Sequence, residues 1–320
     1  MPIVAVLLAL VLSAVSAGAE TPRLAHQFPP DSLPGRGATM FAGMVAARGG
    51  PGGDIAVYGG GMLGDERANL RDLASGRLQF ALTGDLVIAY MAPRFRAVSV
   101  PFALDGPDHA LAVFDGPLGR KLADHLRRER GIVLLAAHYA GTRMLTTNRP
   151  VRSIADLKGL RIRLPPDDTW MAAWRLAGAD PRVVAFPDLE AALRRGHVEA
   201  QENPPNLTRA AGLHRHQRYL VATDHVPQMQ FWFASAAHWD AWPEAVRAAL
   251  RTAAGEAAAW VTEEARRGQA ADVAWLTGEG GMVLLRPDVS GMREAMTGLD
   301  TDAGSGVDAL VRGWIRDARR

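Results

Sequence analysis

Residues 153–166, "SIADLKGLRIRLPP", place a short helix, a glycine stop and a short strand in immediate succession. Ser153 and Asp156 have the spacing of a capping box, in which side chains pair with the free amides at a helix start. Gly159 fits the left-handed residue that ends a helix. The R-I-R-L run alternates charged and apolar residues, which is typical of a half-buried β-strand, and Pro165 ends it because proline has no amide donor.

This strand separates its side chains into two sets. Ile162 and Leu164 face one side of the predicted sheet, and Arg161 and Arg163 face the other. Local reasoning leaves open whether both arginines are solvated or one is directed at a ligand. Because a guanidinium presents two parallel donors that match a carboxylate, Arg163 is a candidate carboxylate clamp. A surface position or a structural ion pair is the alternative.

The same order of helix, glycine, strand and polar turn recurs twice. It is found in residues 63–85, "LGDERANLRDLASGRLQFALTGD", and in residues 187–205, "PDLEAALRRGHVEAQENPP". Three such units favour an α/β fold with mostly parallel strands. Ligands of such folds bind outside the carboxyl ends of the strands, where we expect Arg163, Asn203 and the Thr83–Asp85 turn.

A long Ala-rich segment follows. Residues 243–276, "PEAVRAALRTAAGEAAAWVTEEARRGQAADVAWL", predict a long helix whose weak points are Gly255 and Gly268. The sequence contains no Gly/Ser-rich linker. A division into two lobes must therefore come from crossings of the chain between them.

The composition excludes several function classes. The 320 residues include 36 Lys or Arg and 34 Asp or Glu, without a long basic run, so we predict no nucleic-acid partner. The absence of cysteine excludes disulfides, thiolate metal sites and a cysteine nucleophile.

The N-terminus, "MPIVAVLLALVLSAVSAGAE", is apolar or small as far as an Ala-Gly-Ala site. Its apolar part is short for a membrane span, which needs about 20 residues. We predict a signal peptide over residues 1–19 and an exported, periplasmic mature protein. An uncleaved anchor is the alternative, because no Lys or Arg precedes the apolar part.

No catalytic constellation stands out. His214 and His216 are two residues apart, so on a helix they would point in different directions. Ser235 lacks the G-x-S-x-G turn of a nucleophile, and Asp167–Asp168 fits a solvated turn better than a cation site. We therefore predict no enzymatic activity, no metal and no cofactor.

Other side chains are candidates for a binding site. Arg143, in a Thr-rich strand-like stretch, is a second possible carboxylate clamp or ion-pair residue. Asn203 could donate to and accept from a ligand, or form a turn before proline. Trp170 and Phe186 could form the walls of a pocket or belong to the core.

Several motifs in sequence order are similar to those of one family. Residues 141–165, "GTRMLTTNRPVRSIADLKGLRIRLP", contain G-x-R, N-[RK]-P and D-L-K-G-[LM]-[KR]-[IL]-R. "YGGGMLGDERANLRDLASGRLQFALTGD" precedes them, and "LAGADPRVVAFPDLEAALRRGHVEAQENP", "RYLVATDH" and "HWDAWPEAVRAAL" follow. In these stretches the mature chain resembles the DctP-type solute-binding proteins of TRAP transporters.

The resemblance implies a two-lobe periplasmic binding protein fold of the α/β class, with mixed sheets, crossover hinge strands and a long hinge helix. It assigns residues 20–139 and about 228–268 to one lobe, which we call lobe I. Residues 140–227 and about 269–320 form the other, lobe II.

The resemblance also implies the roles of individual residues. Arg163 forms the salt bridge with the carboxylate of the ligand, Arg143 and Asn203 orient that group, and Phe186 packs on the ligand. Polar contacts at the end of the first strand and beside the "LGD" turn, with one further aromatic wall, complete the expected site: Arg163, Arg143, Asn203, Phe186, Gln27, Glu66 and Trp170.

The function implied by the resemblance is that of a periplasmic receptor. Such a receptor captures a small organic acid unchanged and delivers it to the membrane subunits of a TRAP transporter. Most members of the family are monomers, so we expect a monomer. A sensory receptor for an organic acid and an exported enzyme acting on such acids are the alternatives.

Overall fold

The computed structural model describes residues 21–50, 54–299 and 308–319, and the predicted signal peptide, residues 1–19, lies outside them. The strands are β1 (Arg23–Ala25), β2 (Ala56–Tyr58), β3 (Phe80–Thr83), β4 (Ile132–Thr147), β5 (Arg161–Leu164), β6 (Asp180–Val183), β7 (Ala200–Asn203), β8 (Tyr219–Ser235) and β9 (Val283–Leu285). The α-helices are α1 (Leu33–Ala47), α2 (Glu66–Ala74), α3 (Leu86–Met91), α4 (Pro107–Asp115), α5 (Pro117–Arg130), α6 (Asp168–Leu176), α7 (Leu189–Arg194), α8 (Pro205–Ala210), α9 (Ala236–Ala241), α10 (Glu244–Thr277), α11 (Ser290–Thr297) and α12 (Asp308–Asp317). The 3-10 helices are η1 (Pro93–Ser99), η2 (Ile154–Leu157), η3 (Phe186–Asp188) and η4 (Leu213–His216).

The three helix–glycine–strand units form as predicted. Asp65 caps α2, and its carboxylate accepts a hydrogen bond from the Ala68 amide at 2.8 Å. Ser153 and Asp156 form the capping box at the start of η2. After α7, Gly196 has a φ of 69°, a left-handed conformation that favours glycine. In each unit a short helix is followed by a glycine and then by a strand.

The strands form one mixed sheet, in the order β2-β1-β3-β8-β4-β7-β5-β6, with β9 beside β8. The strands of the predicted units, β3, β5 and β7, each have a parallel neighbour. β1 pairs in parallel with β2 and with β3, and β5 pairs in parallel with β6 and with β7. The pairs of β8 with β3 and β4, and of β4 with β7, are antiparallel. The local pattern therefore predicts the outer strands, and the centre of the sheet is antiparallel.

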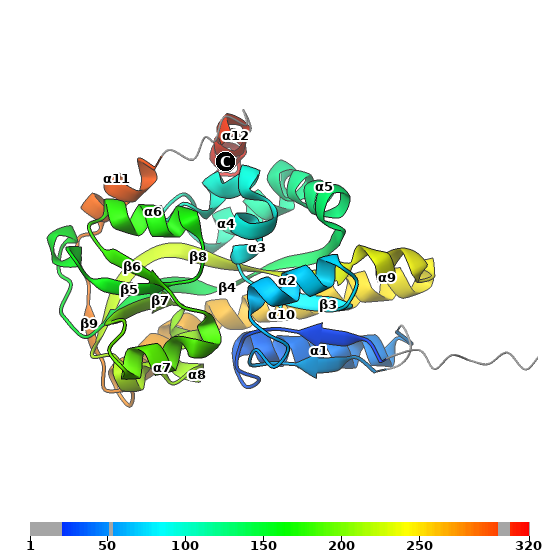
Figure 1. Ribbon diagram of the computed structural model, residues 1–320, viewed down its shortest axis with the longest axis horizontal. Helices are drawn as coiled ribbons and strands as arrows, with labels where there is room; N and C mark the ends of the chain where they lie inside the picture. Colours follow the sequence, from blue (N-terminus) through cyan, green and yellow to red (C-terminus); the bar gives the residue numbers. More distant parts are fainter. Residues whose placement is uncertain (1–20, 51–53, 300–307, 320) are drawn as a thin grey trace, which may run out of the picture.

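Two long strands, β4 and β8, pass through both lobes and pair along their length (Figure 1). Their register shifts between Tyr139 and Thr142, around Gly141, whose φ is 124°. In Figure 1, α1, α2, α5 and α9 surround one half of the sheet, and α6, α7, α8 and α11 surround the other. The crossing strands agree with the expected architecture. The boundaries near residues 139 and 228 stay a prediction.

The helix α10 is continuous over 34 residues and packs against α1, β4 and α8. Its buried side consists largely of alanine, which permits a close approach to the sheet. The interruptions considered at Gly255 and Gly268 do not occur. Glycine inside a helix costs about 1 kcal/mol relative to alanine, and the packing of this helix against both lobes outweighs that cost.

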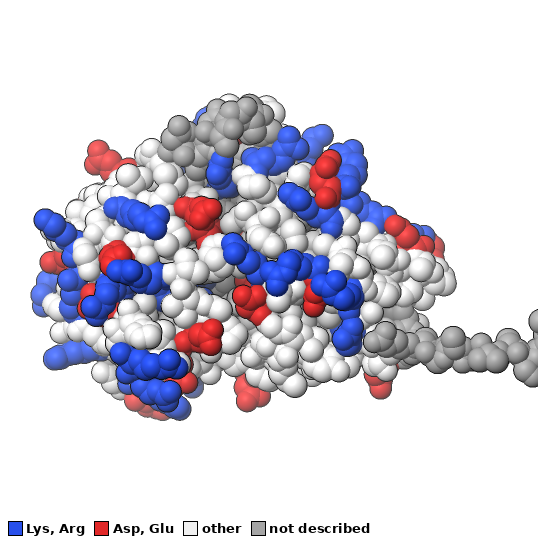
Figure 2. Space-filling model, viewed as in Figure 1, with Lys and Arg blue, Asp and Glu red and all other residues white. Residues whose placement is uncertain are grey.

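The charged residues are mixed over the surface. On the face shown in Figure 2, Lys and Arg side chains alternate with Asp and Glu, which reflects the near cancellation of 36 basic and 34 acidic residues. Among the residues that the structure describes, no helix has both the length and the apolar character needed to cross a membrane.

Candidate functional site

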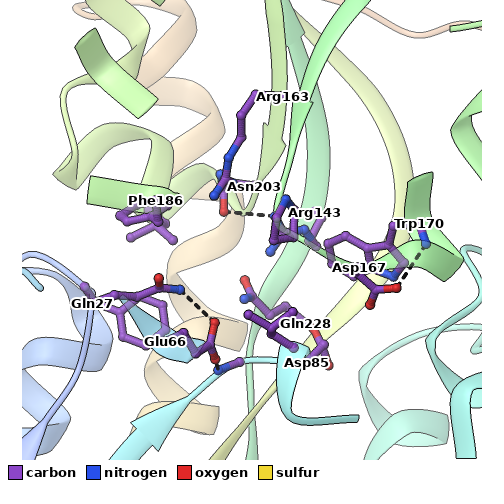
Figure 3. A pocket seen from close by; sticks show the side chains of 15 residues that line it. Gln27, Glu66, Asp85, Arg143, Arg163, Asp167, Trp170, Phe186, Asn203 and Gln228 are labelled. Atoms are coloured by element: carbon purple, nitrogen blue, oxygen red, sulfur yellow. Dashed lines mark hydrogen bonds between the residues drawn. The ribbon is translucent and has the colours of Figure 1, made fainter. Parts of the chain in front are cut away.

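A cavity lies where the ends of β3, β5 and β7 meet the crossing strands β4 and β8 (Figure 3). It encloses about 420 Å³, including space open to solvent. The lining residues are Gln27, Phe28, Glu66, Gly84, Asp85, Leu86, Arg143, Arg163, Pro165, Asp167, Trp170, Phe186, Asn203, Leu207 and Gln228. All seven residues expected from the sequence are among them.

Arg163 reaches the cavity from the end of β5 and is 3% exposed. Its Nε donates to the Val184 carbonyl oxygen at 2.8 Å, and its guanidinium carbon lies 5.8 Å from the centre of the Phe186 ring. Within the described ranges Arg163 forms no ion pair with a carboxylate. Arg161, two residues earlier, is exposed, and its Nη2 lies 3.5 Å from Glu199 Oε2. The strand therefore places one arginine in solvent and the other in the cavity.

Burial lowers the pKa of Arg163 to about 10, a shift that the carboxylates of Glu202 and Glu66 oppose. A pKa of 10 still leaves the guanidinium charged at neutral pH. The cavity therefore contains a buried cation that is ready to accept an anionic partner.

Arg143, from β4, has a different environment. It pairs with Glu202 through Nε, and its Nη2 donates to Glu202 Oε1 at 2.7 Å and to the Glu202 carbonyl oxygen at 2.5 Å. Nη2 also lies 3.0 Å from Asn203 Oδ1. Its guanidinium carbon is 4.9 Å from the centre of the Trp170 ring. Arg143 thus lines the cavity while most of its hydrogen-bonding capacity is used by β7.

Glu202 is fully buried, and burial alone would raise its pKa. Arg143 and His225 outweigh that effect and hold the pKa at about 2. His225 Nε2 lies 3.0 Å from Glu202 Oε2, and His225 Nδ1 lies 2.9 Å from the Thr223 hydroxyl. Although this chain of contacts has the chemical order of a nucleophile, base and acid, none of the three residues lines the cavity. It holds Arg143 in place.

Asn203, at the end of β7, links Arg143 to a neighbouring amide. Its Nδ2 donates to Gln201 Oε1 at 2.5 Å, and Gln201 in turn donates to the Thr146 hydroxyl at 2.8 Å. These bonds fix the amide plane of Asn203 at the wall of the cavity.

Glu66, at the start of α2, and Gln27, after β1, also line the cavity. The Glu66 carboxylate accepts from the Gly84 amide and from Gln27 Nε2, the latter at 2.9 Å. Burial raises the pKa of Glu66 to about 7, against the lowering effect of the Gly84 amide, Arg163 and Arg143. The side chains expected from the resemblance therefore do meet at one place.

Three further polar residues line the cavity: Asp85, which belongs to the turn expected at a strand end, and Gln228 and Asp167, which the sequence did not single out as ligand contacts. Asp85 follows β3, Gln228 lies in β8, and Asp167 caps α6 by accepting from the Thr169 and Trp170 amides at 2.8 and 3.2 Å. The signal for Gln228 is present in "HVPQMQFWFAS", where the amide side chain of Gln228 stands in a strand of mostly apolar, buried residues.

Aromatic side chains close the cavity between the lobes. Trp170, in α6, donates from Nε1 to the Ser99 carbonyl oxygen at 2.6 Å. The Phe186 ring lies 6.4 Å from that of Phe28. Both pairs join residues that the expected boundaries place in different lobes. They exclude water from the polar groups between them, which strengthens the electrostatic interactions there.

The chain is similar to known proteins over most of its length. The sequence model of DctP, described as bacterial extracellular solute-binding protein, family 7, matches residues 24–302. Over 253 residues the chain is 28% identical to the sialic acid-binding periplasmic protein SiaP of Vibrio cholerae, covering 79% of this chain and 78% of that protein.

Two solved structures are similar over almost their whole length. A TRAP periplasmic solute binding protein from a Bordetella species, with density interpreted as pantoate, is 28% identical and superposes with a TM-score of 0.88, over 94% of this chain and 99% of that one. One from a Polaromonas species bound to D-erythronate is 26% identical, with a TM-score of 0.85 over 92% and 98%.

Proposed function

The chain belongs to the DctP family of bacterial extracellular solute-binding proteins, and from that premise we propose that its cavity binds a small organic acid whose carboxylate pairs with Arg163. Arg163 carries this proposal, because it is a buried cation that lines the cavity and has no carboxylate partner among residues 21–50, 54–299 and 308–319. An uncompensated buried charge is costly, and a ligand carboxylate would offset that cost.

The two arginines have separate tasks in this account. The Arg163 fork takes the carboxylate of the ligand, with charge-assisted bonds of about 1.5–3 kcal/mol each. Arg143, held by Glu202, supplies positive potential and orients Asn203 toward the ligand. Phe186 and Trp170 cover the bound acid.

Two structural relatives were solved with density interpreted as pantoate and with bound D-erythronate, both of which are hydroxylated carboxylates. This agrees with a cavity that holds a buried arginine together with amide and carboxyl groups. We therefore place a hydroxylated monocarboxylate first among the ligand candidates.

The protein acts as a receptor and does not alter the acid. In the absence of ligand the lobes open about β4 and β8, and a bound acid stabilises the closed arrangement by contacting both lobes. We propose that the mature protein is an exported monomer and that the membrane subunits of a TRAP transporter receive the acid from it.

Isothermal titration calorimetry with pantoate, D-erythronate and uncharged erythritol tests the proposal. We expect the acids to bind and erythritol not to bind. Arg163→Ala should weaken binding more than about 100-fold, since at least two charge-assisted hydrogen bonds are lost. Arg163→Lys should lose most of that affinity, because an ammonium group cannot provide the planar fork.

Arg161→Ala is the matched control, because Arg161 is exposed on the same strand and pairs only with Glu199 among the described residues. Its affinity should equal that of the wild type. Equal affinity in Arg163→Ala, or binding of erythritol alone, would contradict the proposal.

A further inference from the structure

A second pocket lies where α12 packs against η1 and α5, and it shares no lining residue with the cavity described above. It is lined by residues 94–95 of η1, by four side chains of α5 between Lys121 and Glu129, and by Leu310 and Trp314 of α12. We call it the α5–α12 pocket. It encloses about 680 Å³, including space open to solvent. Sites for small molecules typically have about 300–1,000 Å³, so the pocket is large enough for one.

The wall that α12 contributes is apolar and open to water. Val311 and Ile315 of this helix are buried in the core. Leu310 and Trp314 are also four residues apart, so they form a neighbouring row on the same helix and line the pocket. Leu310 is 56% exposed. A single exposed leucine is ordinary, but this one adjoins an indole ring in a concave site, so the two together can remove an apolar group from water.

The walls from η1 and α5 add two further rings. Phe95 is buried, and the centre of its ring lies 5.7 Å from that of His125. Burial lowers the pKa of His125, and the charges of Arg94 and Arg130 lower it further. The ring is therefore neutral at pH 7, and its Nε2 donates to the Met91 carbonyl oxygen at 3.2 Å. Both rings extend the apolar lining.

Three cations border the same pocket: Arg94 of η1 and Lys121 and Arg128 of α5. Glu129 is the only carboxylate among its described lining residues. Arg94 and Lys121 are exposed, and neither forms an ion pair with another residue of the described ranges. Arg128 Nη2 lies 3.9 Å from Asp124 Oδ2, both on the surface. In Figure 2, Lys and Arg side chains gather where Figure 1 places α5. The pocket therefore has an excess of positive charge.

We propose that the α5–α12 pocket is a second ligand site, which binds a small amphipathic carboxylate. The ring or chain of this ligand lies against Leu310 and Trp314, and Arg94 and Lys121 bind its carboxylate. The apolar wall disfavours a hydroxylated ligand, because a hydroxyl buried there without a partner costs free energy. The cations favour an anion over a neutral or cationic molecule. The site is independent of the ligand that occupies the cavity at Arg163.

Two pairs of probes test this chemistry by calorimetry on the wild-type protein: naphthoate against naphthalenemethanol, and octanoate against octanol. The members of each pair share an apolar body and differ in charge. We expect each acid to bind more tightly than its alcohol by about two- to thirtyfold, since two exposed ion pairs contribute about 0.2–1 kcal/mol each. Acetate, which has the charge without the apolar body, should not bind to this pocket.

Substitutions of exposed residues assign the binding to the pocket without disturbing the core. Arg94→Gln combined with Lys121→Gln should reduce the affinity for both acids to that of the alcohols and leave the alcohols unchanged. Leu310→Ser should weaken acids and alcohols by the same factor, several-fold, because the apolar contact is common to all four. Arg120→Gln combined with Arg175→Gln is the matched control. It removes the same charge at exposed positions outside the lining and should keep the wild-type affinities.

Arg163→Ala distinguishes this site from the cavity between the lobes, and it should bind naphthoate and octanoate as the wild type does. If it lost them, the acids would occupy that cavity, so the second site would be overturned while the proposed function stood. Wild-type affinities in the Arg94→Gln/Lys121→Gln variant would also overturn the proposal, as would equal binding of acids and alcohols. If neither acid bound and the wild type co-sedimented with phosphatidylglycerol vesicles, the pocket would be a contact for a lipid surface and the proposal would be wrong. Absence of binding to both acids and vesicles would overturn it as well.

Discussion

Glu202→Gln removes one charge from the buried ion pair beneath the cavity and keeps the shape of the side chain. Glu202 is inaccessible to solvent, and the Arg143 side chain is 4% exposed. Arg143 binds the Glu202 carboxylate through both Nε and Nη2, and His225 adds a third contact. The substitution leaves the guanidinium buried without its anion, which typically costs about 3–5 kcal/mol.

The pKa of Glu202 gives a second route to the same magnitude. It lies at about 2 instead of 4.5, and each unit corresponds to about 1.4 kcal/mol, so the ionised group contributes about 3 kcal/mol at pH 7. Because this pKa is lowered in the folded state, the contribution is complete above about pH 4.5. It is lost progressively as the pH falls toward 2.

Urea denaturation at pH 7 should therefore show Glu202→Gln to be about 3–5 kcal/mol less stable than the wild type, and the difference should shrink below pH 4.5. The control is Glu199→Gln, which breaks the partly exposed pair with Arg161 and should cost less than about 1 kcal/mol. A loss below 1 kcal/mol in Glu202→Gln, or a difference independent of pH, would refute the structural role assigned to this pair.

Three further predictions concern closure and acid stability. Trp170→Phe removes the hydrogen bond to Ser99, so calorimetry should show ligand affinity reduced by about two- to tenfold with an unchanged fold, a net loss of about 0.5–1.5 kcal/mol. Gly61 has a φ of 78°, and a Cβ there would lie 2.8 Å from Cγ of Pro187, which the expected boundaries place in the other lobe. Gly61→Ala should therefore weaken ligand binding by hindering closure, and small-angle scattering should show a larger radius with ligand present than for the wild type. Burial lowers the pKa of His138 to about 3. Below about pH 6.5 His138 is therefore protonated in the unfolded chain but stays neutral in the folded protein. The free energy of unfolding of the wild type should fall by about 1.4 kcal/mol per pH unit from this group as the pH decreases. Thermal unfolding of His138→Gln should show a shallower loss over pH 6.5–4.

The sequence predicts the outer parts of the fold because they depend on short-range signals. Asp65, the Ser153–Asp156 box and Gly196 act within one or two turns of their own position. The separation of Arg161 from Arg163 likewise follows from strand alternation. The expectation that Arg163, and not Arg161, contacts the ligand comes from the family motif. The structure places Arg163 at the cavity, as that motif implies.

The partners across the sheet could not be read from the sequence. Arg143 and Glu202 are 59 positions apart and meet because β4 pairs with β7, so the ion pair depends on a register that no local pattern encodes. Asp85 and Gln228 come together in the same way, through the pairing of β3 with β8. The polar residues were visible in the sequence, but which of them share one cavity is decided by the crossing of the long strands.

A crystal structure of the protein with bound D-erythronate would show directly whether Arg163 pairs with the carboxylate of the ligand. We expect the carboxylate within about 3 Å of the Arg163 terminal nitrogens, as charge-assisted hydrogen bonds require. A ligand with its carboxylate away from Arg163, or bound outside this cavity, would contradict it.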